Sequence, residues 1–75
     1  MTQNKPHFFV ELYVSETDDW RLVSKHISLF NAHDGIVQAR RQAYLDSDIQ
    51  RIEGKYRIRD THDNTTHFMF DFGIY

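Results

Sequence analysis

The stretch YRIRDTHDNTTHFMFDFGIY, residues 56–75, contains two runs in which apolar and polar side chains alternate. The second run places four apolar side chains on one side: Phe68, Phe70, Phe72 and Ile74. A two-residue period predicts a β-strand with one face toward a core. The polar segment DTHDNTT between the runs has Asp63 and Asn64 at its tip, and both residue types tolerate unusual backbone dihedrals. The stretch therefore predicts a β-hairpin, with its first strand opening at Lys55.

A second hairpin is predicted near the N-terminus. HFFVELYV, residues 7–14, alternates apolar Phe8, Val10, Leu12 and Val14 with His7, Phe9, Glu11 and Tyr13. SETDD, residues 15–19, is a polar turn of hairpin length. WRLVSKHI then supplies the partner strand, in which Trp20, Leu22 and Ser24 alternate with Arg21, Val23 and Lys25. We expect Lys25 to point away from the core.

Between the two hairpins the period of the apolar residues changes to three and four, which predicts a helix. Asn31 is the expected N-cap, with Asp34 three residues later, and the helix is expected to end near Leu45. Its inward stripe is narrow because it is made largely of alanine, which predicts a helix lying close to a sheet. The segment 49–54 is interpreted either as a loop or as the opening of the third strand.

The element order ββαββ predicts an α+β fold of two layers, a four-stranded antiparallel or mixed sheet with one helix packed on one face. Residues 1–6 are polar up to Pro6 and are predicted to be a flexible N-terminal tail. Residues 7–75 are predicted to form a single domain, since 75 residues leave no room for a second core. The expected core side chains of the first and last strands are Phe8, Val10, Leu12, Phe68, Phe70 and Phe72.

Composition excludes several classes of protein. The chain has no cysteine, which removes disulfides, thiolate nucleophiles and cysteine-based zinc sites. Nine Lys and Arg against eleven Asp and Glu give a net charge of -2, whereas nucleic-acid binding favours a positive excess. No apolar segment is long enough for a membrane span or resembles a secretion signal, so no membrane association and a cytoplasmic location are expected.

One helix cannot cover both faces of the sheet, so the residues out of phase with the core are expected to meet water or a partner. Aromatic residues, Met and Arg are enriched at protein–protein contacts. We therefore predict a protein-binding surface, with either a foreign partner or a second copy in a homodimer, and its residues are Phe9, Tyr13, Arg57, Arg59, Met69 and Tyr75. The competing interpretation is that residues such as Phe9 and Met69 only cover one another across strands.

Single-stranded nucleic-acid binding by the same face is the alternative function. Exposed aromatics on a four-stranded sheet can stack bases, and Lys55, Arg57 and Arg59 form a basic row on one strand. The negative net charge, the single helix and the lack of an RNP-type aromatic motif argue against it.

Metal binding and catalysis are not predicted. Asp60, His62, Asp63 and His67 are possible ligands, but these residue types are also those expected in a turn, and the spacing of the two histidines matches no known ligand pair. The paired aspartates lie beside chain reversals, and the three glycines form no phosphate-binding loop. The expected function is a small non-catalytic binding module, an adaptor or stand-alone inhibitor, with no cofactor and no metal.

Overall fold

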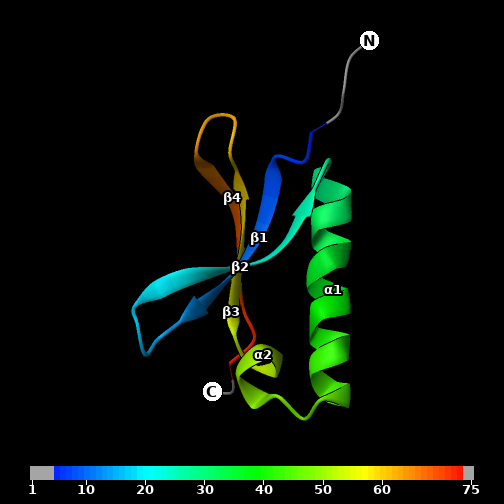
Figure 1. Cartoon of the computed structure of the whole chain (residues 1–75), viewed down its shortest axis with the longest axis vertical. Helices are drawn as coiled ribbons and strands as arrows, with labels where there is room; N and C mark the ends of the chain where they lie inside the picture. The colour runs from blue at the N-terminus through cyan, green and yellow to red at the C-terminus, as the bar shows by residue number, and fades with distance from the viewer. Residues whose placement is uncertain (1–4, 74–75) are drawn as a thin grey trace.

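A computed structural model describes residues 5–73 of the chain. Its elements are β1 (Phe8–Val14), β2 (Asp19–His26), α1 (Leu29–Leu45), α2 (Ile49–Ile52), β3 (Lys55–Asp60) and β4 (Thr65–Asp71). The four strands form one sheet of order β2-β1-β3-β4, and every neighbouring pair is antiparallel. Helix α1 packs along one face of this sheet (Figure 1). The predicted ββαββ fold is confirmed, and of the two sheet types considered it is the antiparallel one.

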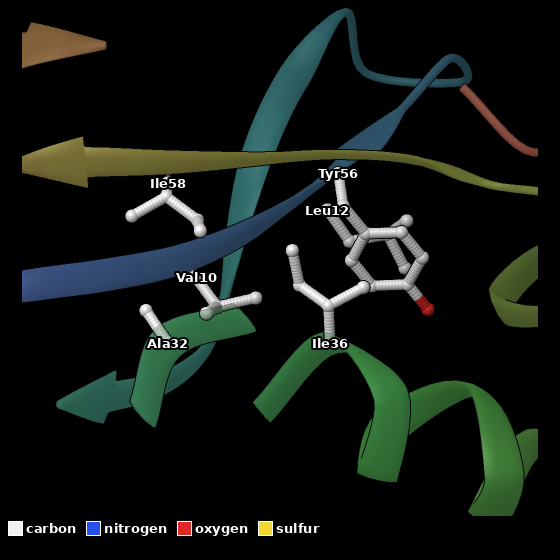
Figure 2. Packing of buried hydrophobic residues seen from close by; sticks show 6 residues of the cluster. All are labelled: Val10, Leu12, Ala32, Ile36, Tyr56 and Ile58. Atoms are coloured by element: carbon white, nitrogen blue, oxygen red, sulfur yellow. The ribbon is translucent and has the colours of Figure 1, made fainter. Parts of the chain in front are cut away.

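The core forms where the two central strands meet α1. Val10 and Leu12 of β1 and Tyr56 and Ile58 of β3 pack against Ala32 and Ile36 of the helix, and each of the six is at most 7% exposed (Figure 2). Alanine at the contact lets the helix axis approach the sheet closely. The buried ring of Tyr56 also donates a hydrogen bond of 2.6 Å from its hydroxyl to the carbonyl of Arg51, which ties α2 to β3.

The helix boundaries differ from the sequence expectation at one end. Helix α1 starts at Leu29 with Ser28 as its N-cap. The sequence predicted Asn31 as the N-cap, which would have started the helix three residues later. The hydroxyl of Ser28 accepts a hydrogen bond of 3.1 Å from the backbone N–H of Asn31. The helix ends at Leu45 as predicted.

The segment after α1 is neither a loop throughout nor the opening of a strand. Ile49–Ile52 forms the short helix α2, with Asp48 as its N-cap. The Asp48 carboxylate accepts from the backbone N–H of Arg51 at 3.4 Å and from its Nε at 2.8 Å. This local capping makes the segment helical.

The expectation that the phenylalanines near the C-terminus are core is wrong for Phe68 of β4, which is 43% exposed. It holds only in part for Phe70 of β4 and for Phe72, which follows the strand, since both are half-buried. The reason is the position of α1, which packs over β2, β1 and β3, whereas β4 is an edge strand. The three rings stack along the strand, with successive centroids 6.1 and 6.2 Å apart.

The predicted tail falls mainly on residues 1–4, and the end of the last predicted strand on residues 74–75, all outside the described residues. Strand pairing extends one residue before β1, since the N–H of His7 donates to the carbonyl of His26 at 3.1 Å. Among residues 5–73, neither helix has the length and apolar content needed to cross a membrane.

Candidate functional site

The face of the sheet opposite α1 carries three rows of side chains, each running across all four strands. We call this surface the open face. From β2 to β4 its rows are Lys25, Phe9, Arg59 and Thr66, then Leu22, Glu11, Arg57 and Met69, then Trp20, Tyr13, Lys55 and Asp71. Neither helix of residues 5–73 packs on it, because α1 lies on the other face and α2 packs against α1 (Figure 1).

The centre of the open face is an ion-pair cluster around Glu11, which is only 6% exposed. Its Oε1 accepts from Nε of Arg57 at 2.7 Å and from Nε of Arg59 at 3.1 Å, and Nη2 of Arg59 reaches Oε2 at 3.3 Å. Burial alone would raise the pKa of Glu11, but the hydrogen bonds and charges of Arg59 and Arg57 together lower it below its usual value. Glu11 is therefore an anion that holds two guanidinium groups in place.

The aromatic rings of the open face each have a cation nearby. The Arg57 guanidinium lies 4.2 Å from the ring centroid of Trp20. Arg59 and Lys25 lie 5.7 and 5.2 Å from the ring of Phe9, within the range in which a cation is attracted to a ring face.

The third ring, that of Tyr13, has the Lys55 ammonium 5.5 Å away and packs edge-on against Trp20 at 5.4 Å. Its hydroxyl donates a hydrogen bond to Asp18 in the turn after β1. The aromatic and cationic side chains of the open face are thus ordered by one another.

The structure brings together five of the six side chains predicted to bind a partner. Phe9, Tyr13, Arg57, Arg59 and Met69 all lie on the open face. Met69 is 57% exposed, whereas the other four are half-buried among their neighbours. The sixth, Tyr75, lies outside the described residues.

Sequence alternation assigned Trp20 and Leu22 to the wrong face of β2. The β1–β2 register shifts between Val10 and Glu11, so that Leu22 pairs with Glu11 and lies on the open face. A β-bulge of this kind reverses the parity of the strand beyond it. The register next to the turn contains the missing signal. Val14 pairs with Asp19, so the next pair away from the turn is Tyr13 with Trp20, which puts both rings on the same face.

A second register shift, between Ile58 and Arg59, moves His67 off the open face. Alternation placed His67 beside Met69, but Thr66 takes the position opposite Arg59. The His67 imidazole instead lies 3.5 Å from the carboxylate of Asp60 and packs edge-on against Phe8, which is on the α1 side.

The open face is more positive than the chain as a whole. Its ionisable side chains are four cations, Lys25, Lys55, Arg57 and Arg59, and two anions, Glu11 and Asp71. The chain has a net charge of -2, so its remaining surface is acidic.

Residues 5–73 form two hollows, one on the α1 side of the sheet and one whose lining includes Tyr13, Leu22, Lys55 and Asp71 at the edge of the open face. A shallow apolar one of 190 Å³ separates α1 from β4 and is lined by His33, Ile36, Val37, Phe70 and Phe72. A polar cleft of 590 Å³ lies between the β1–β2 hairpin and α2, where Gln50 donates to Glu16 at 3.3 Å and Arg51 pairs with Asp48.

Comparison of the chain with protein-family models, with curated proteins and with solved structures finds no significant match.

Proposed function

We propose that this chain is a small non-catalytic module that binds another protein through the open face, as a cytoplasmic adaptor or stand-alone inhibitor. The observation that carries the proposal is the cluster of Trp20, Phe9, Tyr13 and two arginines across strands β2, β1 and β3, with no helix of the described residues above it. A cluster of large side chains at the protein surface is typical of an interaction site.

The chemistry of the open face indicates the kind of partner. Trp, Tyr and Arg are the residues most often found at the energetic centre of protein interfaces. Leu22 and Met69, at opposite ends of the middle row, are the exposed apolar contacts. Because cations outnumber anions on this face, the partner is expected to present acidic side chains around an apolar patch.

The fixed conformation of the arginines favours binding of a protein over stacking of bases. Holding a side chain in one conformation before association lowers the entropy lost on binding. Arg57 and Arg59 are held by Glu11 and by the rings of Trp20 and Phe9. The same cations occupy ring faces that bases would need for stacking, which disfavours nucleic acid. Single-stranded nucleic acid is therefore kept only as the alternative partner.

Affinity capture from the native cell tests the proposal with two charge-introducing variants, Leu22→Asp and Met69→Asp. Both side chains are substantially exposed, so the fold should tolerate the changes. A matched control is Leu45→Asp, which puts the same charge at an exposed apolar position on α1. We expect the two open-face variants to lose a partner that the control retains. Equal capture by all three variants would contradict the proposal.

Two solution measurements identify the class of partner. Sedimentation equilibrium over a range of concentrations detects a homodimer, and Met69→Asp should make it monomeric if the open face forms the contact. Titration of a labelled oligonucleotide at two salt concentrations detects the alternative, because binding to phosphates weakens steeply with salt.

A further inference from the structure

The turn between β3 and β4 brings three metal-ligating side chains together. Asp60 at the end of β3, Asp63 in the turn and His67 in β4 each offer one ligand atom, and these atoms all lie within 4.8 Å of one another. His67 Nε2 and Asp60 Oδ2 are 3.5 Å apart. Of the two histidines near this turn, only His67 belongs to the group. The ring of His62 packs instead on the ring of His7, with centroids 4.2 Å apart.

The convergence follows from the β-bulge in β4. Since Thr66 pairs with Arg59, His67 is the extra residue of the strand, and its ring turns toward Asp60. Asp60 is largely buried, with its side chain 14% exposed. Its Oδ1 accepts from the N–H of His62 at 2.9 Å, which fixes the carboxylate and directs Oδ2 to His67.

The third carboxylate is also oriented. Asp63 Oδ1 accepts from the N–H and the hydroxyl of Thr65, at 3.2 and 2.6 Å. These two bonds hold one oxygen of the Asp63 carboxylate against the turn. The side chain of Arg59 on β3 is directed to Asn64 and Glu11.

We propose that Asp60, Asp63 and His67 bind one divalent transition-metal ion of the zinc class. One imidazole nitrogen and two carboxylate oxygens are ligands that zinc accepts at about 2.0–2.2 Å, and in a tetrahedral site such ligands lie roughly 3.3–3.6 Å apart. The His67–Asp60 distance already falls in this range. Asp63 and His67 are exposed and can close the remaining gap by side-chain rotation.

The site leaves one tetrahedral position for water or for a ligand from another molecule. Its ion would cross-link the two strands at the turn, where Asn64 accepts a hydrogen bond of 2.9 Å from Arg59 of the open face. Metal binding thus stabilises the end of the hairpin that holds Arg59, one of the two arginines bound to Glu11.

Titration of tag-free protein with Co²⁺, followed by absorption, and with Zn²⁺, followed by calorimetry, tests the site. We expect one equivalent to bind, and His67→Ala or Asp63→Asn to weaken binding at least roughly tenfold. Asp63→Asn keeps the oxygen that accepts from Thr65, so it removes the charge without removing the turn. Circular dichroism of each variant verifies that it is folded.

The matched control is His62→Ala, which removes an imidazole from the same turn but keeps the backbone N–H bonded to Asp60. This variant should bind Co²⁺ as the unchanged protein does, and Zn²⁺ should raise its melting temperature equally. The proposal is overturned by an absence of saturable binding at millimolar metal. Equal loss in His62→Ala and His67→Ala would overturn it too.

Discussion

Glu11 lies at the centre of a surface that faces water, yet it is almost completely buried. It is covered by the two arginines that it binds, and their stems and guanidinium planes extend over Trp20 and Phe9. A buried carboxylate is costly unless hydrogen bonds satisfy its oxygens, and here three do. Glu11 is therefore the anion that links the two arginines at the centre of the open face.

Replacing Glu11 by Gln should destabilise the protein by about 1–3 kcal/mol, since two partly buried arginines lose the anion that pairs with them. Chemical denaturation measures the loss. The control Glu16→Gln changes an exposed residue of the β1–β2 turn and should stay within about 0.5 kcal/mol of the unchanged protein. A Glu11 variant as stable as this control would show that the cluster contributes nothing.

Gly54 is a second position where a single residue is critical, because the structure leaves no space for a side chain there. A Cβ atom there would lie 2.4 Å from Cδ1 of Leu12 and 2.6 Å from the carbonyl oxygen of Gln50. The carbonyl belongs to the backbone of α2 and cannot rotate away. Gly54→Ala should therefore cost about 1–3 kcal/mol, measured by thermal or chemical unfolding. Gln50→Ala, which leaves that carbonyl in place, should be close to neutral.

At the scale of elements, sequence reasoning works where the determinants are local. The two hairpins and α1 follow from alternation, from turn residues and from an apolar period, and all are present. The two β-bulges are not local features, because they depend on which strand residues pair. They account for the misassignment of Trp20, Leu22 and His67. The exposure of Phe68 likewise depends on where α1 crosses the sheet, which no single strand encodes.

The start of α1 lies three residues before the one expected from a cap at Asn31. Ser28 and Asn31 are both good N-cap residues, and the structure assigns the cap to Ser28. Ser28→Ala should thus cost about 0.5–2 kcal/mol. Asn31→Ala, inside the first turn, should be neutral or slightly stabilising because alanine is the better helix former. The reverse ranking in denaturation experiments would place the helix start at Asn31.

For the whole molecule, the core is small, so electrostatic interactions contribute a large share of a small free energy of unfolding. Seven apolar side chains are buried in the described residues, so a few kcal/mol decide stability. Two ionisable groups lie on opposite faces of the sheet: Glu11 on the open face, and His26 under α1, where its Nε2 is 2.7 Å from the hydroxyl of Ser24. Their separation by the sheet leads us to expect nearly additive contributions.

Stability should fall in two stages as the solution is acidified. Burial lowers the pKa of His26 below its usual 6.5, although the charge of Asp34 opposes this shift. Above that pH His26 is neutral in both states and contributes nothing, but below it the unfolded chain takes up the proton first, so the folded state loses stability. The pKa of Glu11 is also lowered, from 4.5, so its contribution is complete above that pH and is lost as the pH falls through the folded value.

Denaturation midpoints measured from pH 8 to pH 3 separate the two stages. His26→Gln should flatten the profile below about pH 6.5 and leave the acidic stage, whereas Glu11→Gln should flatten only the decline below about pH 4.5. An unchanged slope between pH 7 and pH 5 in His26→Gln would mean that the imidazole under α1 takes up its proton as easily in the folded protein as in the unfolded chain. In that case the contact between β2 and Gly35 of α1 would have to be looser than the structure shows, because a Cβ at Gly35 would lie only 2.4 Å from that ring.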